Sequence, residues 1–201
     1  MRQSNVYIII FSALLTVVLG GLLSLAAVGL KPMQDLQVAL DTQKKILGAV
    51  IQLQPEDDVP SIYDARIRSE VVNIEGEVVE EVDGEPVVAE KVSIASQFDK
   101  EPEERVYPVY KFVNESNPEQ VDAYIFPIYG TGLWDDIWGY VALENDLETL
   151  KGVVFDHAGE TPGLGARITS VDVQERFQEK KIYDELGKLV AVRMVKGETG
   201  E

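Results

Sequence analysis

The residues best suited to chemistry lie in the run Glu160–Gly165 (ETPGLG), which follows His157, the single histidine of the chain. Pro162 and Gly163 fit the two central positions of a type II turn, because proline fixes φ and glycine accepts a positive φ. Gly165 has no Cβ and lets the backbone approach another group closely. Such a turn can direct backbone N–H groups toward an anionic or carbonyl-rich ligand. The alternative is an ordinary tight turn, since Gly and Pro occur in most loops.

A second candidate is the aromatic segment Gly130–Tyr140, which contains both tryptophans of the chain, Trp134 and Trp138, bracketed by three glycines. One interpretation is a corner of the core held by large aromatic side chains. The other is a flat apolar wall with free backbone groups, as a planar cofactor requires.

Metal and covalent chemistry have little support in the sequence. The chain has no cysteine, which excludes disulfides, thiolate metal sites and a cysteine nucleophile. His157 has Asp156 and Glu160 as its close acidic neighbours, so we expect a turn histidine with satisfied hydrogen bonds rather than a metal ligand. Eight acidic residues between Glu70 and Glu90 lack the spacing of a calcium loop and indicate a solvated edge. We expect no catalytic residue and no metal site.

The charge of the chain is strongly acidic, with a formal net charge of −17. Residues 1–31 carry only Arg2 and Lys31, which leaves −19 for the remaining 170 residues. A domain with this charge is repelled by nucleic acid, so we exclude a nucleic-acid partner.

The N-terminal segment predicts a membrane anchor. Val6–Leu30 is almost wholly apolar, and as a helix its 25 residues span roughly 37 Å, more than the hydrocarbon core of a bilayer. The run is too long for the apolar region of a signal peptide. We therefore predict a transmembrane helix with a short tail over 1–31. The few lysines and arginines around it do not decide its orientation.

The rest of the chain predicts a stalk and one domain. Pro32 should begin an amphipathic helix, Met33–Leu53, that packs onto the domain, so 32–60 is a stalk and linker. Residues 61–201 predict an α+β domain with a mixed sheet. Its expected elements are a hairpin at Asp83-Gly84, strands at Arg105–Val113, Val121–Tyr129, Val141–Leu143, Leu150–Asp156 and Leu186–Val195, and a helix at Val171–Lys180.

Several motifs, in order along the chain, resemble those of the NqrC family, whose members are components of the sodium-translocating NADH:quinone reductase. They are Gly29-Leu30-Lys31, the run 40–47 (LDTQKKIL), Gly132-Leu133-Trp134, Trp138-Gly139-Tyr140, and His157–Gly165. The last motif is shared with RnfG, a component of the ion-pumping Rnf complex, and Gly132-Leu133-Trp134 favours the quinone reductase.

The resemblance implies an α+β FMN-binding domain on the outer face of the bacterial cytoplasmic membrane, tethered by one helix. It implies that the flavin relays electrons within a membrane complex of several subunits that oxidises NADH, reduces ubiquinone and exports Na⁺. The partners would be the other subunits of that complex and the membrane. The alternatives are an RnfG-type electron-transport protein and a membrane-anchored scaffold without redox function.

The resemblance also assigns cofactor contacts. It implies that Leu133 and Trp134 line the flavin and that Lys196 offsets phosphate charge. It implies that a turn wraps the flavin with side-chain and backbone polar groups, and the residues of that turn are Glu160, Thr161, Pro162, Gly163, Leu164 and Gly165. The family attaches FMN through its phosphate to a threonine in a Ser-Gly-Ala-Thr-x-Thr motif, which is absent here. We expect the sequence to be incomplete at its C-terminal end.

Overall fold

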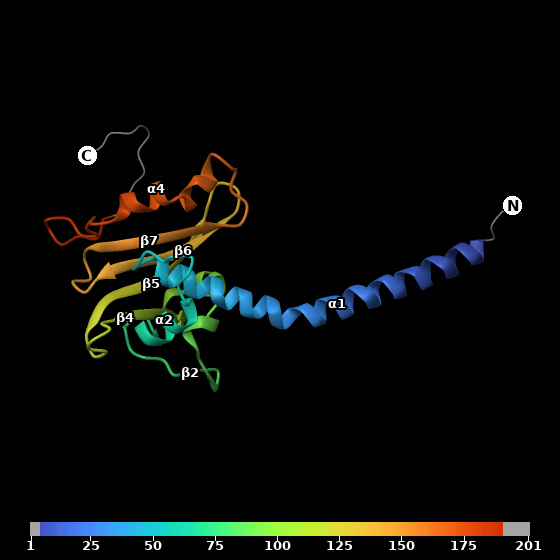
Figure 1. The fold of residues 1–201 in the computed structure, drawn as a ribbon, viewed down its shortest axis with the longest axis horizontal. Helices are drawn as coiled ribbons and strands as arrows, with labels where there is room; N and C mark the ends of the chain where they lie inside the picture. Colours follow the sequence, from blue (N-terminus) through green and yellow to red (C-terminus); the bar gives the residue numbers. More distant parts are fainter. Residues whose placement is uncertain (1–4, 191–201) are drawn as a thin grey trace. The chain divides into compact units, whose positions relative to one another are not determined.

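The structure is a computed structural model that describes residues 5–190. The chain divides into two compact units, Met1–Asp41 and Thr42–Glu201. The described part of the first unit is helical, and the second unit contains the sheet and every other element of Figure 1.

The first helix, α1 (Asn5–Gly48), joins two segments that the sequence analysis separated. Pro32 was expected to begin a new helix, but it lies inside α1. A proline removes only one hydrogen bond of a helix, and the apolar and amphipathic segments on either side both favour helix. Among residues 5–190, α1 is the one helix long and apolar enough to cross a membrane.

The second unit is organised around a five-stranded sheet with the order β1-β4-β5-β6-β7. The strands are β1 (Ile67–Val72), β4 (Tyr107–Val113), β5 (Val121–Thr131), β6 (Asp136–Glu144) and β7 (Leu150–His157). Figure 1 shows β4 to β7 side by side. The α+β class is confirmed, but the pairs in the described part of the chain are all antiparallel, whereas a mixed sheet was expected.

Local turn chemistry explains the small hairpin of β2 (Glu81–Val82) and β3 (Glu85–Pro86). Its two loop residues, Asp83 and Gly84, have φ of 54° and 81°. A two-residue type I′ loop requires positive φ at both positions, which Asp-Gly tolerates. The hairpin predicted at Asp83-Gly84 is confirmed.

Apolar side chains cover both faces of the large sheet. Neighbouring residues of β6 point to opposite faces, so Ala142 joins the main core whereas Leu143 joins a second, smaller cluster. The main core includes Ile46 and Leu47 from the end of α1, both fully buried. The predicted packing of the stalk onto the domain is therefore confirmed for these residues.

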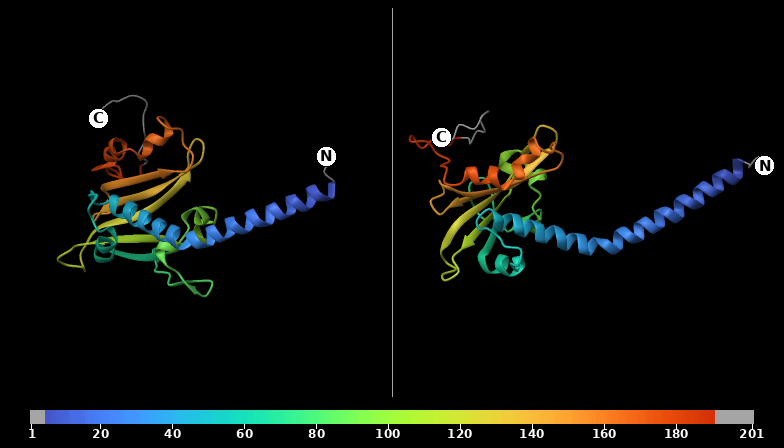
Figure 2. Two further views of the ribbon diagram at one scale, coloured as in Figure 1. Left: turned by 45° about the vertical axis from the view of Figure 1, so that its right-hand side comes forward. Right: turned by 45° about the horizontal axis from the view of Figure 1, so that its top comes forward.

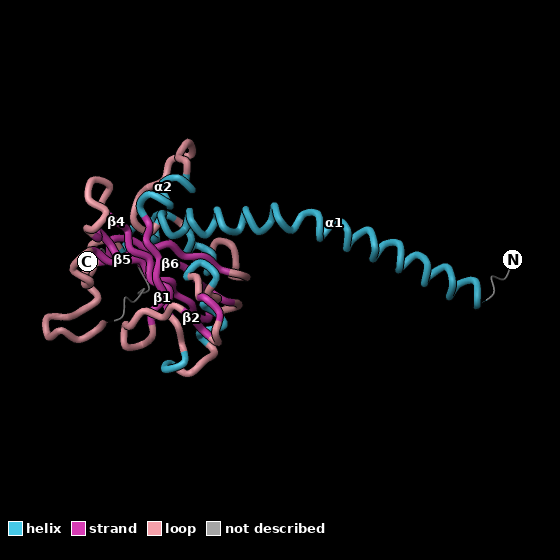
Figure 3. Tube along the Cα trace, turned by 90° about the horizontal axis from the view of Figure 1, so that it is seen from below, coloured by secondary structure: helices cyan, strands magenta, loops and turns pink. Residues whose placement is uncertain are grey.

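Short helical segments surround the sheet. They are α2 (Val59–Arg66), α3 (Ile94–Phe98), α4 (Val171–Gln174), and the 3₁₀ turns η1 (Ala89–Lys91), η2 (Pro102–Glu104), η3 (Gly165–Thr169) and η4 (Glu175–Phe177). Of these, η3, α4 and η4 contact β7, and Figure 2 shows the α4 region beside that strand. Figure 3 shows the short helical segments outside the strands.

The C-terminal elements are shorter than predicted. The helix expected at Val171–Lys180 ends as η4, because Gln178 is extended and Glu179 has a φ of 63°, a left-handed conformation that stops a helix. The strand expected at Leu186–Val195 is reduced to an isolated bridge between Tyr183 and Leu189 in its described part. Its remaining residues, 191–195, lie outside the described residues.

We predict that Gly152→Ala destabilises the domain by about 1–3 kcal/mol, because overpacked cores lose stability on this scale. A Cβ at Gly152 would lie 2.5 Å from the backbone oxygen of Ala49, directly after α1. Thermal unfolding of the full chain in detergent measures the effect. Gly130→Ala is the control, since a Cβ there meets no atom within 4 Å. Equal melting temperatures for the two variants would contradict the prediction.

Candidate functional site

The first part of the candidate site is the tip of the β5–β6 hairpin. The register pairs Thr131 with Asp136, which leaves Gly132–Asp135 as the connecting loop. The backbone N–H of Gly132 donates to the carbonyl oxygen of Asp135, with an N···O distance of 2.8 Å. This bond closes the loop and leaves Leu133 and Trp134 pointing outward, 82% and 71% exposed.

The second part is the turn that follows β7. The backbone N–H of Leu164 donates to the carbonyl oxygen of Thr161 at 3.1 Å, and Gly163 has a φ of 77°. Pro162 and Gly163 therefore occupy the central positions of a type II turn, as predicted. The side chain of Leu164 is 74% exposed at this turn.

Glu160 connects the two parts. It is 5% exposed, and its Oε1 accepts a hydrogen bond from the backbone N–H of Trp134 at 3.0 Å. A Cβ at Gly132 would overlap with Oε1, and a Cβ at Gly165 would overlap with Oε2. The close approach predicted at Gly165 is confirmed, and the group that it approaches is this carboxylate.

The aromatic wall predicted from the two tryptophans is divided between two places. Trp134 is on the exposed loop, whereas Trp138 is inside β6 and pairs with Asp156 of β7. Trp138 lines a separate pocket of about 430 Å³ together with Tyr110, Tyr129 and Tyr140. Of the two tryptophans, Trp134 is the one whose backbone N–H bonds to Glu160.

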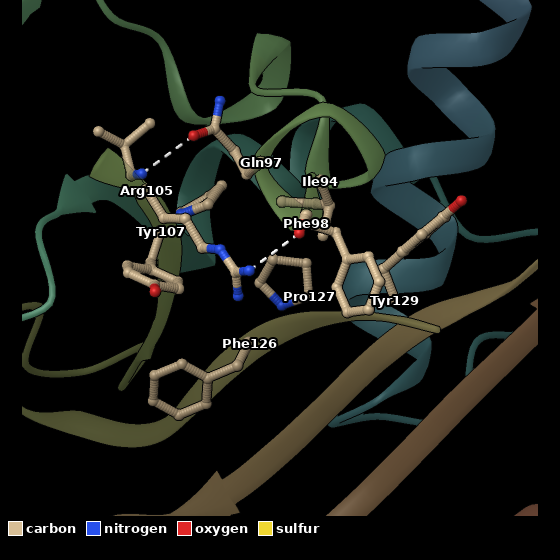
Figure 4. Close-up of a pocket in the computed structure, with 10 residues that line it drawn as sticks. Ile94, Gln97, Phe98, Arg105, Tyr107, Phe126, Pro127 and Tyr129 are labelled. Atoms are coloured by element: carbon tan, nitrogen blue, oxygen red, sulfur yellow. Dashed lines mark hydrogen bonds between the residues drawn. The ribbon is translucent and has the colours of Figure 1, made fainter. Parts of the chain in front are cut away.

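Another pocket lies between α3 and the strands β4 and β5 (Figure 4). Its lining is mostly apolar, and the Arg105 guanidinium donates to the carbonyl oxygens of Lys100 and Phe98 at 2.8 and 2.9 Å. Its volume of about 160 Å³ is below the range that holds an organic cofactor.

His157 is the last residue of β7 and pairs with Ile137 of β6. Its Nδ1 is buried and has no hydrogen-bond partner among residues 5–190. The expectation of a satisfied turn histidine is therefore wrong, because the residue belongs to the strand and its Nδ1 has no hydrogen-bond partner among the described residues. The described residues contain no group of three or more His, Cys, Asp or Glu side chains that could hold a metal ion.

Beside His157, Asp156 forms an ion pair with Lys45 of α1. Burial alone would raise the pKa of the Asp156 carboxyl. Hydrogen bonds from Lys45 and from the backbone N–H of His157, together with the charge of Lys45, outweigh burial and hold this pKa below its ordinary value. The pair therefore connects the end of α1 to the strand that leads into the candidate site.

Two positively charged side chains could offset the charge of a phosphate, and one of them lies in the described part of the chain. Lys196 lies outside the described residues. Arg167 is in η3, two residues after Gly165, and its guanidinium lies 3.5 Å from the carboxylate of Asp172. Its side chain is 61% exposed, so it remains accessible to an anion.

Comparison with known proteins identifies the family. The FMN-binding domain family matches residues 132–199, a range that begins at Gly132 and includes both loops. NqrC of the Na(+)-translocating NADH-quinone reductase of Haemophilus ducreyi is 31% identical over 198 residues, which cover 94% of this chain and 76% of that protein. This chain belongs to the NqrC family.

Solved structures agree with this assignment. NqrC of Parabacteroides distasonis has a TM-score of 0.68 and 30% identity, over 83% of this chain and 77% of that one. NqrC of Shewanella oneidensis has a TM-score of 0.67 and 27% identity, over 81% and 79% of the two chains. The similarity to NqrC that was inferred from the motifs is therefore confirmed.

Two residues whose contacts position the loops were missed by sequence reasoning. Gly132 was quoted as part of a motif, but its need for space beside Glu160 was not predicted. Asp135 was missed as well, and a Cβ at Gly159 would lie 2.8 Å from its Oδ2. The glycines in both loops were the sequence feature that indicated these close approaches. The sequence does not show, however, which group each glycine approaches.

We predict that Asp156→Asn lowers the free energy of unfolding by about 1 kcal/mol at neutral pH, the scale of a partly exposed ion pair. Because folding lowers the pKa of Asp156, its stabilisation is present above the ordinary aspartate pKa. It is lost as the pH falls through the lower, folded-state value. Melting temperatures measured against pH should therefore differ at neutral pH and converge in acid. The exposed Asp64→Asn is the control, and a gap between wild type and Asp156→Asn that persists in acid would contradict the prediction.

Proposed function

We propose that this chain is the FMN-carrying electron-transfer subunit of a sodium-translocating NADH:quinone reductase. The observation that carries the proposal is the pair of loops joined at Glu160. They expose three large apolar side chains, Leu133, Trp134 and Leu164, within the range that matches the FMN-binding domain family. Isolated exposed apolar residues are common, but three on two loops joined through one carboxylate would together suit a planar ligand.

The chain's own residues fit the flavin in shape and polarity. Leu133, Trp134 and Leu164 would cover the ring system and exclude water from it. Thr161, Pro162 and Gly163 belong to the turn that the bond from Leu164 N–H to the Thr161 carbonyl closes, and its remaining backbone polar groups would face the flavin. The bound flavin supplies the electron-transfer chemistry, and the protein determines its position and surroundings.

The phosphate end of FMN requires positive charge in a chain with a net charge of −17. Arg167 lies close to the turn in sequence, and we assign it, with Lys196, to offset the phosphate charge. Charge-assisted hydrogen bonds from such cations are roughly twice as strong as those between neutral groups.

At the level of the complex, we propose that the protein passes electrons between other redox centres while the complex oxidises NADH, reduces ubiquinone and exports Na⁺. The names of the relatives support a sodium-translocating NADH-quinone reductase. The partners are then the other subunits of that complex. We further propose that α1 spans the bacterial inner membrane, with the second unit on the periplasmic face.

FMN titration into the purified full chain tests the proposed site. Trp134→Ala should weaken FMN binding about tenfold, since stacking on an aromatic side chain contributes roughly 1–3 kcal/mol per base in nucleic-acid complexes. Trp138→Phe is the matched control, because Trp138 lines a different pocket. Quenching of flavin fluorescence measures both affinities. Absence of FMN binding to the unmutated chain would overturn the proposed function.

Labelling of a single engineered cysteine tests the orientation. The chain has no cysteine, so Glu115→Cys in the exposed β4–β5 loop gives one reactive site. A membrane-impermeant maleimide should label it in spheroplasts without lysis. Ser4→Cys, on the other side of the apolar run, should be labelled only after lysis. The reverse pattern would place the domain in the cytoplasm.

A further inference from the structure

We infer that Glu160 is a positioning residue that holds the two loops of the flavin site in their binding arrangement before the flavin arrives. The inference rests on the proposed function for its ligand, but its structural basis is independent of the flavin. The resemblance implies that Glu160 is one of the residues that contact the cofactor. In the structure its carboxylate lies between the hairpin tip and the turn, inside the protein.

The burial of this carboxylate indicates a specific role. Between residues 5 and 190, Glu160 is the one acidic or basic residue that is buried. A buried charge is costly unless hydrogen bonds stabilise it. The backbone N–H of Trp134, 26 positions earlier in the chain, supplies such a bond at 3.0 Å. Glu160 therefore connects two segments that are distant from each other in the sequence.

The glycines on either side show how closely the loops approach this carboxylate. The three atoms nearest to a Cβ built at Gly165 all belong to Glu160. The φ of Gly165 is not in the left-handed region, so this glycine is needed for space rather than for backbone conformation. Gly132 meets the other carboxylate oxygen in the same way. The two oxygens of one carboxylate thus set the separation of the two loops.

The contacts of Glu160 with the two glycines also determine the positions of the exposed apolar side chains. Leu133 and Trp134 directly follow Gly132, and Leu164 directly precedes Gly165. Fixing the two glycines against one carboxylate therefore fixes the spacing of the apolar surface. A site held in its bound geometry binds more tightly, because less freedom is lost when the ligand arrives.

Hydrogen exchange of the flavin-free full chain in detergent tests the positioning directly. Glu160→Ala removes the acceptor for the Trp134 amide, so its exchange should accelerate by about tenfold or more. Glu160→Gln retains an amide oxygen as an acceptor and should preserve most of the protection. Amides in the centre of β5 should be unchanged in both variants. Unchanged exchange at Trp134 in Glu160→Ala would overturn the inference.

A double-mutant cycle isolates the contact with the turn. Gly165→Ala alone should accelerate Trp134 exchange, because its Cβ displaces the carboxylate. Added to Glu160→Ala, it should have little further effect, since the group that it displaces is already absent. Gly163→Ala is the control, because it strains a positive φ in open space and should act additively with Glu160→Ala. Additive effects of Gly165→Ala and Glu160→Ala would also overturn the inference.

FMN affinity separates this inference from the proposed function. Glu160→Ala should weaken FMN binding about tenfold, and Glu160→Gln should restore most of it. Weaker binding with unchanged Trp134 exchange would make Glu160 a direct contact and overturn its positioning role. Faster Trp134 exchange in a chain that binds no FMN would support the positioning role and overturn the proposed function.

Discussion

The contact between the Glu160 carboxylate and two glycine-containing loops is the constraint on which the candidate site depends. A carboxylate can be buried here because the Trp134 N–H donates to it and because neither Gly132 nor Gly165 has a Cβ that would displace it. Because a buried polar group without a partner is costly, the bond from Trp134 N–H favours the loop arrangement that supplies this donor. The apolar side chains beside the glycines are exposed on these two loops.

The sheet supplies the rigid frame for these loops. The long pairing of β5 with β6 carries the hairpin tip, and the pairing of β6 with β7 places His157 opposite Ile137. The end of α1 packs on the same strands through Ile46, Leu47 and the Lys45–Asp156 ion pair. The segment that follows the apolar part of α1 is therefore attached directly to the strand that precedes the turn. The candidate site and the end of α1 are therefore connected through the same sheet.

Much of the fold could be predicted because its signals are local. Strands β4, β5 and β7 follow runs of β-branched and aromatic residues, and the Asp83-Gly84 hairpin follows from its two loop residues. The predictions of element boundaries failed where contacts with neighbouring segments outweighed the local preference of the sequence. Pro32 did not interrupt a helix favoured on both sides, and β6 begins at Asp136 because its residues pair with β5 and β7 in spite of the glycines around it.

The sequence by itself determined the apolar N-terminal helix, the Pro162-Gly163 turn and the motifs of the NqrC family, because each depends on residues adjacent in the chain. Only the tertiary structure decided that Trp134 and Trp138 belong to different places and that Glu160 faces the Trp134 loop. It also decided that Lys45 pairs with Asp156, 111 positions away. These outcomes depend on strand register and on which face of the sheet a side chain occupies, and both are set by packing between distant segments.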